Sequence, residues 1–169
     1  MKKIVFVFVL LFSVPICFSE SLAIQIVQSS GTDSRIFATS YLFEQSIIDY
    51  FFSSGHIVSN SAVFVKSDDE ETNKKEFNRV MKETVEGGME WLVRVEVEYG
   101  VKNSRNPESF LLDNITKVTW TSYSSKSGKK VSSGTEKPNS SAAKDNSEHG
   151  ITGFSNKIAS KISAEIGRR

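Results

Sequence analysis

Side chains suited to catalysis are sparse in this chain of 169 residues, which contains two histidines and one cysteine. Neither His56 nor His149 belongs to a recognised catalytic sequence pattern. A Ser-His-Asp triad is assembled in space, so the sequence leaves a hydrolase open as an alternative. The chain nevertheless lacks the Gly-x-Ser-x-Gly turn that exposes a nucleophilic serine in many hydrolases. We therefore predict no catalytic residues and no enzymatic activity.

Acidic side chains form two groups that resemble sites. Glu96 and Glu98 lie two residues apart on an expected strand, which places both carboxylates on one face about 7 Å apart, a separation that glycosidases also use. The run 68–71 is acidic throughout, but a calcium loop spaces its ligands around a glycine turn, whereas consecutive carboxylates suit the start of a helix. The chain also lacks a phosphate-binding glycine loop, a zinc signature and a nucleotide fingerprint. We predict a solvated strand face, a helix start, no metal site and no cofactor.

The N-terminal segment indicates export. Two lysines precede a mostly apolar run over residues 4–18, which contains Pro15 and ends in small and polar residues. A membrane span needs about 20 apolar residues, whereas a basic start and a shorter apolar run are typical of a secretory signal peptide. We predict a signal peptide at 1–19, with cleavage near 19–23, and no stable transmembrane segment afterwards. The expected location is extracytoplasmic, either periplasmic or associated with the envelope.

Cys17 is the one cysteine of the chain. Bacterial lipoproteins acylate a cysteine at such a place, so a lipoprotein is the alternative. Ile16 stands where a small residue normally precedes that cysteine, and we therefore favour cleavage over lipidation. A mature chain without Cys17 has no disulfide and no thiolate metal ligand.

Charge argues against nucleic acid as a partner. Without Lys2 and Lys3 the 21 basic residues fall to 19, against 20 acidic ones, whereas non-specific nucleic-acid binding needs a basic surface. Basic residues concentrate in 114–169. We interpret this as attraction between two parts of one fold, with a basic surface facing an anionic envelope component as the alternative.

Hydrophobic periodicity predicts an α+β (mixed α/β) fold in the order β-α-β-α-β-β-β-α. We expect a single sheet of four to five strands with two to three packed helices. The predicted strands are 23–28, 56–59 with 62–65, 90–99, 114–124 and 129–136, and the predicted helices are 35–54, 68–86 and 152–166. The predicted domains are an α/β core at 20–136, a flexible linker at 137–150, and a C-terminal helix at 151–169 that docks on the core.

The stretch 90–99 alternates strictly, with Trp91 and four apolar or aromatic residues on one side, and Leu92 and three charged residues on the other. Such a strand has one face in the core and one polar face. The stretch 114–124 adds a second polar face, to which we also assign Ile115. The candidate partner surface is the polar side of both strands: Arg94, Glu96, Glu98, Lys117, Thr119, Thr121 and Tyr123.

Four features resemble a known family. A strand and loop precede the long helix, 55–59 forms a short strand after it, and Gly87-Gly88 opens the strand 89–95. The segment 118–121 is then followed by a Ser-Gly turn and a lysine-containing return strand. Together they resemble the small extracytoplasmic α/β domain of the TolB amino-terminal and LpoB type. This resemblance implies a non-enzymatic protein that binds other envelope proteins.

We therefore expect an exported, non-enzymatic domain of the bacterial cell envelope that binds proteins or assists their assembly. Its expected partners are envelope proteins. The alternative is a periplasmic carrier of an apolar or lipid ligand, suggested by the aromatic face of the helix 35–54. That face collects Ile36, Phe37, Tyr41, Phe43, Ile47, Ile48, Phe51 and Phe52.

Overall fold

The computed structural model describes residues 19–30, 35–100, 109–138 and 145–167. These residues form one five-stranded sheet and three helices in the predicted order, so the predicted fold class is confirmed. The elements are β1 (Ser21–Ser29), α2 (Ala38–Ser53), β2 (Ile57–Val65), α3 (Glu70–Glu86), β3 (Trp91–Tyr99), a short 3-10 turn (Leu112–Asn114), β4 (Ile115–Ser124), β5 (Lys130–Glu136) and α4 (Glu148–Ile166). Cys17 and the apolar run 4–18 lie outside the described residues, as do 139–144 of the predicted linker.

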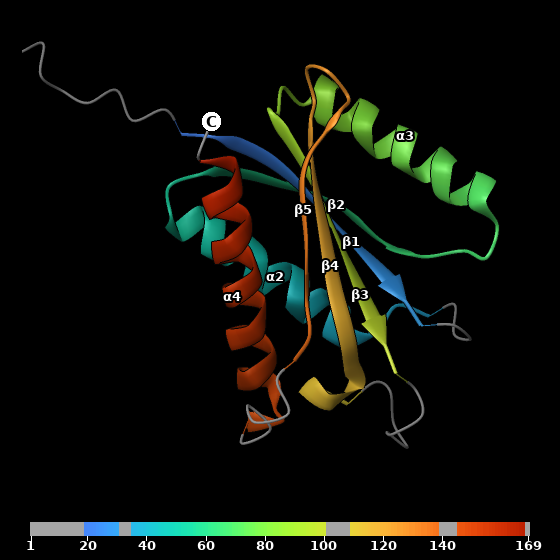
Figure 1. Cartoon of the computed structure of the whole chain (residues 1–169), viewed down its shortest axis with the longest axis vertical. Helices are drawn as coiled ribbons and strands as arrows, with labels where there is room; N and C mark the ends of the chain where they lie inside the picture. Colours follow the sequence, from blue (N-terminus) through green and yellow to red (C-terminus); the bar gives the residue numbers. More distant parts are fainter. Residues whose placement is uncertain (1–18, 31–34, 101–108, 139–144, 168–169) are drawn as a thin grey trace, which may run out of the picture.

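The strand order across the sheet is β2-β1-β3-β4-β5. β1 pairs in parallel with both β2 and β3, whereas β3, β4 and β5 pair antiparallel. Parallel neighbours need a crossover, and here α2 and α3 supply it on opposite faces of the sheet (Figure 1). The polar strand β5 lies at one edge of the sheet, and β2 lies at the other.

One face of the sheet, which we call the inner face, is covered by α2 and α4. The two helices lie side by side (Figure 1), and the rings of Phe43 and Phe154 approach to 6.3 Å between centroids. Their fully buried side chains pack on Leu22, Ile24 and Val95 of the sheet. Each such side chain contributes about 1.5–3 kcal/mol through the apolar surface it removes from water.

The opposite face, which we call the outer face, is covered in part by α3. Val80 packs there against Ala23 and Leu92. The acidic run at 68–71 is a helix start, as predicted, because Asp69 accepts hydrogen bonds from the backbone N–H groups of Glu71 and Thr72. The hydroxyl and amide donors of that first turn hold the pKa of Asp69 below its usual range.

The expected apolar face of the helix 35–54 is wrong in part. Tyr41 and Phe52 belong to that expected face but are 51% and 74% exposed. The buried apolar stripe of α2 is narrower, because among its apolar side chains only the i, i+4, i+8 row of Phe43, Ile47 and Phe51 reaches zero exposure.

Three details of the strands and the last helix also differ from expectation. Ile115 lies in the inner core with Val118, because a β-bulge separates the pairs Glu98↔Lys117 and Tyr99↔Ile115 and returns Ile115 to the inner face. The two predicted pieces of 56–65 are one continuous strand. α4 begins at Glu148, inside the predicted linker 137–150, and its first turn buries Ile151.

Candidate functional site

The strand register brings all seven predicted surface residues together on the outer face. Three of them on β3 stand directly opposite partners on β4, in the pairs Arg94↔Thr121, Glu96↔Thr119 and Glu98↔Lys117. Tyr123 is opposite Leu92 on the same side. The antiparallel register therefore turns two alternating sequence patterns into one continuous patch.

Helix α3 divides this patch into a covered part and an open part. The ring of Phe77 lies 4.9 Å from the ring of Tyr123 and 5.4 Å from the guanidinium carbon of Arg94. Arg94 and Tyr123 are therefore partly covered by α3. The five residues that lie beyond Phe77 form the open part of the patch: Glu96, Glu98, Lys117, Thr119 and Thr121.

Ion pairs organise the open part. Lys117 Nζ is 2.7 Å from Glu98 Oε2, and Lys66 Nζ, just after β2, is 2.6 Å from Glu96 Oε1. The hydrogen bond from Lys117 lowers the pKa of Glu98 and, in return, raises the pKa of Lys117. Exposed pairs of this kind add little to folding stability. Their main effect is to keep the open part nearly neutral.

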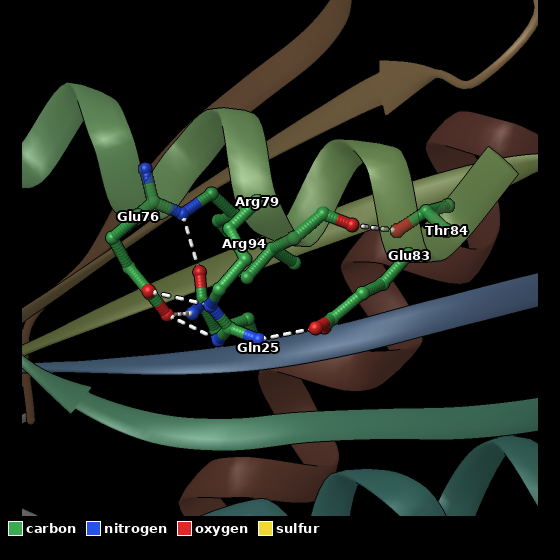
Figure 2. Close-up of polar contacts among 7 residues, drawn as sticks. Gln25, Glu76, Arg79, Glu83, Thr84 and Arg94 are labelled. Atoms are coloured by element: carbon green, nitrogen blue, oxygen red, sulfur yellow. Dashed lines mark hydrogen bonds and ion pairs between the residues drawn. The ribbon is translucent and has the colours of Figure 1, made fainter. Parts of the chain in front are cut away.

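A polar network beneath α3 holds Arg94 in place (Figure 2). Arg94 Nε donates to Gln25 Oε1 at 2.8 Å, and Gln25 Nε2 donates to Glu76 Oε1 at 2.8 Å. Arg79 donates to Glu76 through Nε at 2.8 Å and Nη2 at 2.6 Å, and it also pairs with Glu83. The hydrogen bond from Arg79 holds the pKa of Glu76 below its usual range.

The sequence patterns did not reveal this network, although one signal was present. Gln25 is fully buried, and it is a polar residue within the apolar stretch that forms β1. A buried amide requires hydrogen-bond partners, so Gln25 could have indicated a polar contact on the outer face. Glu76 and Arg79, by contrast, look like ordinary exposed helix residues.

Arg94 itself has an unusual position for a cation. Among the described residues, no carboxylate oxygen lies within 4.0 Å of its guanidinium nitrogens, whereas Lys66 and Lys117 each have such a partner. Partial burial lowers the pKa of Arg94, because water that would stabilise the charge is excluded. The ring of Phe77 offsets part of that cost through a cation–π contact.

A groove of about 220 Å³ opens beside Arg94. Sites for drug-sized ligands typically measure about 300–1,000 Å³, so this groove suits one side chain better than a metabolite. Of the seven predicted residues, Glu98 and Lys117 lie outside its lining. The lining residues are Val27, Phe64, Lys66, Asn73, Arg94, Glu96, Thr119, Thr121 and Tyr123.

The histidines lie elsewhere. His56 Nδ1 is 4.0 Å from Glu20 Oε2 at the start of β2, and His149 is 3.9 Å from Asp145 in the first turn of α4. Neither lines the groove. Within the described ranges, no cluster of three or more His, Cys, Asp or Glu side chains could hold a metal ion. No helix in those ranges has the length and apolar character needed to cross a membrane.

The comparisons identify a family and two distant structural matches. A family model described as "Uncharacterised protein" matches residues 21–167. The chain is similar to the PelC dodecamer of Paraburkholderia phytofirmans, with 12% identity, coverage of 87% and 88% of the two chains and a TM-score of 0.48. It is also similar to lipoprotein GNA1162 of Neisseria meningitidis, with 20% identity, coverage of 88% and 99%, and a TM-score of 0.41. No curated protein matches the chain.

Proposed function

Since this chain belongs to the uncharacterised family that matches residues 21–167, we propose its function from the geometry of the outer face. The proposed function is that of a non-enzymatic domain of the bacterial cell envelope that binds another envelope protein or assists its assembly. The contact surface is the open part of the outer face together with the groove beside Arg94. The resemblance of the sequence to TolB amino-terminal and LpoB-type domains belongs to the same proposal.

One observation carries this proposal: helices cover the inner face of the sheet almost completely and the outer face only in part. α2 and α4 cover the inner face, where the apolar side chains of β1, β3 and β4 have almost no exposure. α3 covers only one end of the outer face and leaves a groove beside Arg94, whose guanidinium nitrogens have no carboxylate oxygen within 4.0 Å in the described part of the chain. A partly covered cation in a groove is a natural contact for a second protein, since arginine is enriched at the centres of interfaces.

The lining of the groove supports binding over catalysis. It contains no histidine and no cysteine, so it lacks the usual base for activating a hydroxyl nucleophile. Its one carboxylate, Glu96, is engaged by Lys66 at 2.6 Å. A glycosidase-like pair is also absent from the groove, because Glu98 lies outside the lining.

A photocrosslinking experiment tests the proposal. A benzophenone amino acid replaces Thr119 or Thr121 in the full chain, produced in its native host with its own N-terminal segment. Matched positions on other surfaces are Asp49 of α2 and Lys82 of α3, both exposed. We expect one envelope protein to be captured through Thr119 and Thr121 but not through Asp49 or Lys82. Equal capture at all four positions, or none, would contradict the proposal.

The apolar-ligand alternative has one specific observation in its favour. An open hollow of about 530 Å³ lies at the end of the sheet beside Val85, Met89 and Trp91. The aromatic side chains of α2 that first suggested a carrier do not line it, because Phe43 and Phe51 are fully buried in the inner core. Mass spectrometry of the gently purified protein would reveal a bound lipid, and Val85→Ser should then lower its occupancy.

A further inference from the structure

We propose that the groove beside Arg94 is a carboxylate-binding site, which receives an acidic side chain of the partner protein. This inference rests on the proposed function, because it names the chemistry that the outer face recognises. The guanidinium of Arg94 makes the main contact. The hydroxyl groups that surround it complete the site.

Arg94 is held so that one edge of its guanidinium stays available. Its Nε is used by Gln25 Oε1 at 2.8 Å, and Phe77 packs on its plane. Among the described residues, neither Nη1 nor Nη2 has a hydrogen-bond partner. These two nitrogens are the pair that donates side by side to a carboxylate in bidentate contacts.

Two hydroxyl groups beside Arg94 have spare hydrogen-bonding capacity. Tyr123 and Thr121 both line the groove, and their side chains form no hydrogen bond within the described residues. A bound carboxylate has about four acceptor positions, so it can accept from the guanidinium and from these hydroxyl groups together.

The charge of the groove also favours an anion. Lys66 and Glu96 pair at 2.6 Å, so the lining residues carry one net positive charge, that of Arg94. Glu76 and Glu96 attract this charge without forming an ion pair with it among the described residues. A monoanion would neutralise it. A dianion would be repelled more strongly by the carboxylate of Glu96, which lies in the same lining.

A phosphate group fits less well. Phosphate sites commonly use free backbone N–H groups at a helix N-terminus, and Asn73, near the N-terminus of α3, lines this groove. The amides of Glu71 and Thr72 are already occupied by the carboxylate of Asp69, at 3.2 and 3.0 Å.

The network under α3 makes this site rigid before the partner arrives. Gln25 is fully buried and connects Arg94 to Glu76, which Arg79 holds in turn. A side chain that is already ordered loses less conformational freedom on binding. Gln25 is therefore a positioning residue, because it acts on the ligand only through Arg94.

The test uses nuclear magnetic resonance on the ¹⁵N-labelled full chain. The probes are the capped peptides acetyl-Gly-Glu-Gly-amide and acetyl-Gly-Gln-Gly-amide, together with inorganic phosphate. We expect saturable shifts of the Arg94 Nε–H signal and of the Thr121 and Tyr123 amides with the glutamate peptide. A single bidentate contact should give a dissociation constant of roughly 1–10 mM, and the glutamine peptide should bind at least tenfold more weakly.

Variants separate this contact from general charge. Arg94→Met keeps packing on Phe77 but should abolish the shifts, and Arg94→Lys should weaken binding about tenfold or more because one ammonium replaces a two-pronged donor. Lys82→Met removes one positive charge on the exposed side of α3 and should leave binding unchanged. Thermal melts establish that each variant is folded, and the Arg94→Lys result stands if Arg94→Met does not fold.

Three outcomes would overturn the inference. They are no saturable shift with the glutamate peptide, equal binding of the glutamine peptide, and phosphate binding more tightly than the carboxylate. Crosslinking through Thr119 in the Arg94→Met background distinguishes the two proposals. Undiminished capture in Arg94→Met would contradict the carboxylate site but not the proposed function. Absence of capture in the parent chain would contradict the proposed function.

Discussion

The inner and outer faces of this sheet are stabilised by different chemistry. On the inner face, α2 and α4 bury aromatic and branched side chains such as Phe43 and Ile158 to zero exposure. On the outer face, α3 makes a small apolar contact through Val80 and then a polar contact through Glu76 and Gln25. α2 and α4 therefore provide most of the stability, whereas α3 also orients polar groups. Substitutions on the two faces should therefore separate stability from binding.

The largest expected effect is a loss of stability on the inner face. Phe43→Ala should lower the free energy of unfolding by about 3–5 kcal/mol, because it removes a fully buried ring and leaves a cavity between α2 and α4. Phe52→Ala on the same helix is the control, since Phe52 is 74% exposed, and it should change stability by less than about 0.5 kcal/mol. Urea denaturation measures both, and similar losses for the two variants would refute the assignment of the inner core.

A close approach at the edge of the inner face gives the second prediction. A methyl group at Gly134 of β5 would lie 2.1 Å from Cζ2 of Trp120 on β4. Gly134→Ala should therefore displace the indole, weaken its 3.1 Å hydrogen bond to Glu165, and cost about 1–3 kcal/mol through overpacking. Ser133→Ala, one residue away and exposed, is the control. Unchanged tryptophan fluorescence and stability in Gly134→Ala would show that the indole does not lie over Gly134.

The third prediction concerns the outer face. Gln25→Ala should lower the free energy of unfolding by about 1–2 kcal/mol, because it removes a buried amide that joins Arg94 to Glu76. Gln45→Ala removes an exposed amide that donates to Asp49 at 2.7 Å and should cost less than about 0.5 kcal/mol. The same Gln25 variant should reduce crosslinking through Thr119. If it lowers stability but leaves crosslinking unchanged, Gln25 has no positioning role.

Hydrophobic periodicity in the sequence correctly predicted which side chains of a strand face the core. The alternation over 90–99 placed Val93 and Val95 in the core and Arg94 on the opposite side, and the register confirms both faces. Ile115 was misplaced because a β-bulge breaks the period of two, and the bulge depends on how β3 and β4 pair rather than on either strand alone. Local patterns cannot detect such an offset.

The sequence predicted which residues form the candidate surface, but it did not predict which of them α3 covers. Alternation shows that a strand face is polar, but it does not show which part of that face a helix crosses. The stacking of Phe77 on Arg94 and Tyr123 arises from the crossover between β2 and β3, whose path is a tertiary property. Gln25 was the residue that could have revealed the network, because a glutamine within an apolar strand needs a partner. The groove itself depends on Phe64 and Lys66 from an edge strand and the segment that follows it.

The two faces also differ in how their carboxylates respond to pH. Glu44 faces β2 from α2 and is 8% exposed, and burial raises its pKa above the usual 4.5 despite a hydrogen bond from Asn60. Glu76 accepts hydrogen bonds from Arg79, which lower its pKa below 4.5. A raised pKa means that the stabilising contribution of Glu44 is complete below pH 4.5 and is lost as pH rises through the folded-state pKa. For Glu76 the contribution is complete above pH 4.5 and is lost as pH falls through the lowered pKa.

Substitution of each carboxylate by glutamine therefore gives the smallest but most discriminating prediction. At pH 7, Glu44→Gln should raise the free energy of unfolding slightly, because it removes a charge that burial disfavours. Glu76→Gln should lower it slightly at pH 7, because the partly exposed ion pair with Arg79 is lost. Both differences should shrink as the pH falls to 3, where Glu44 is already neutral and the advantage of Glu76 is declining. Urea denaturation at pH 3 and pH 7 measures the change in the free energy of unfolding for each variant. Changes of the same sign at pH 7 would show that the environments of Glu44 and Glu76 do not shift their pKa values in opposite directions.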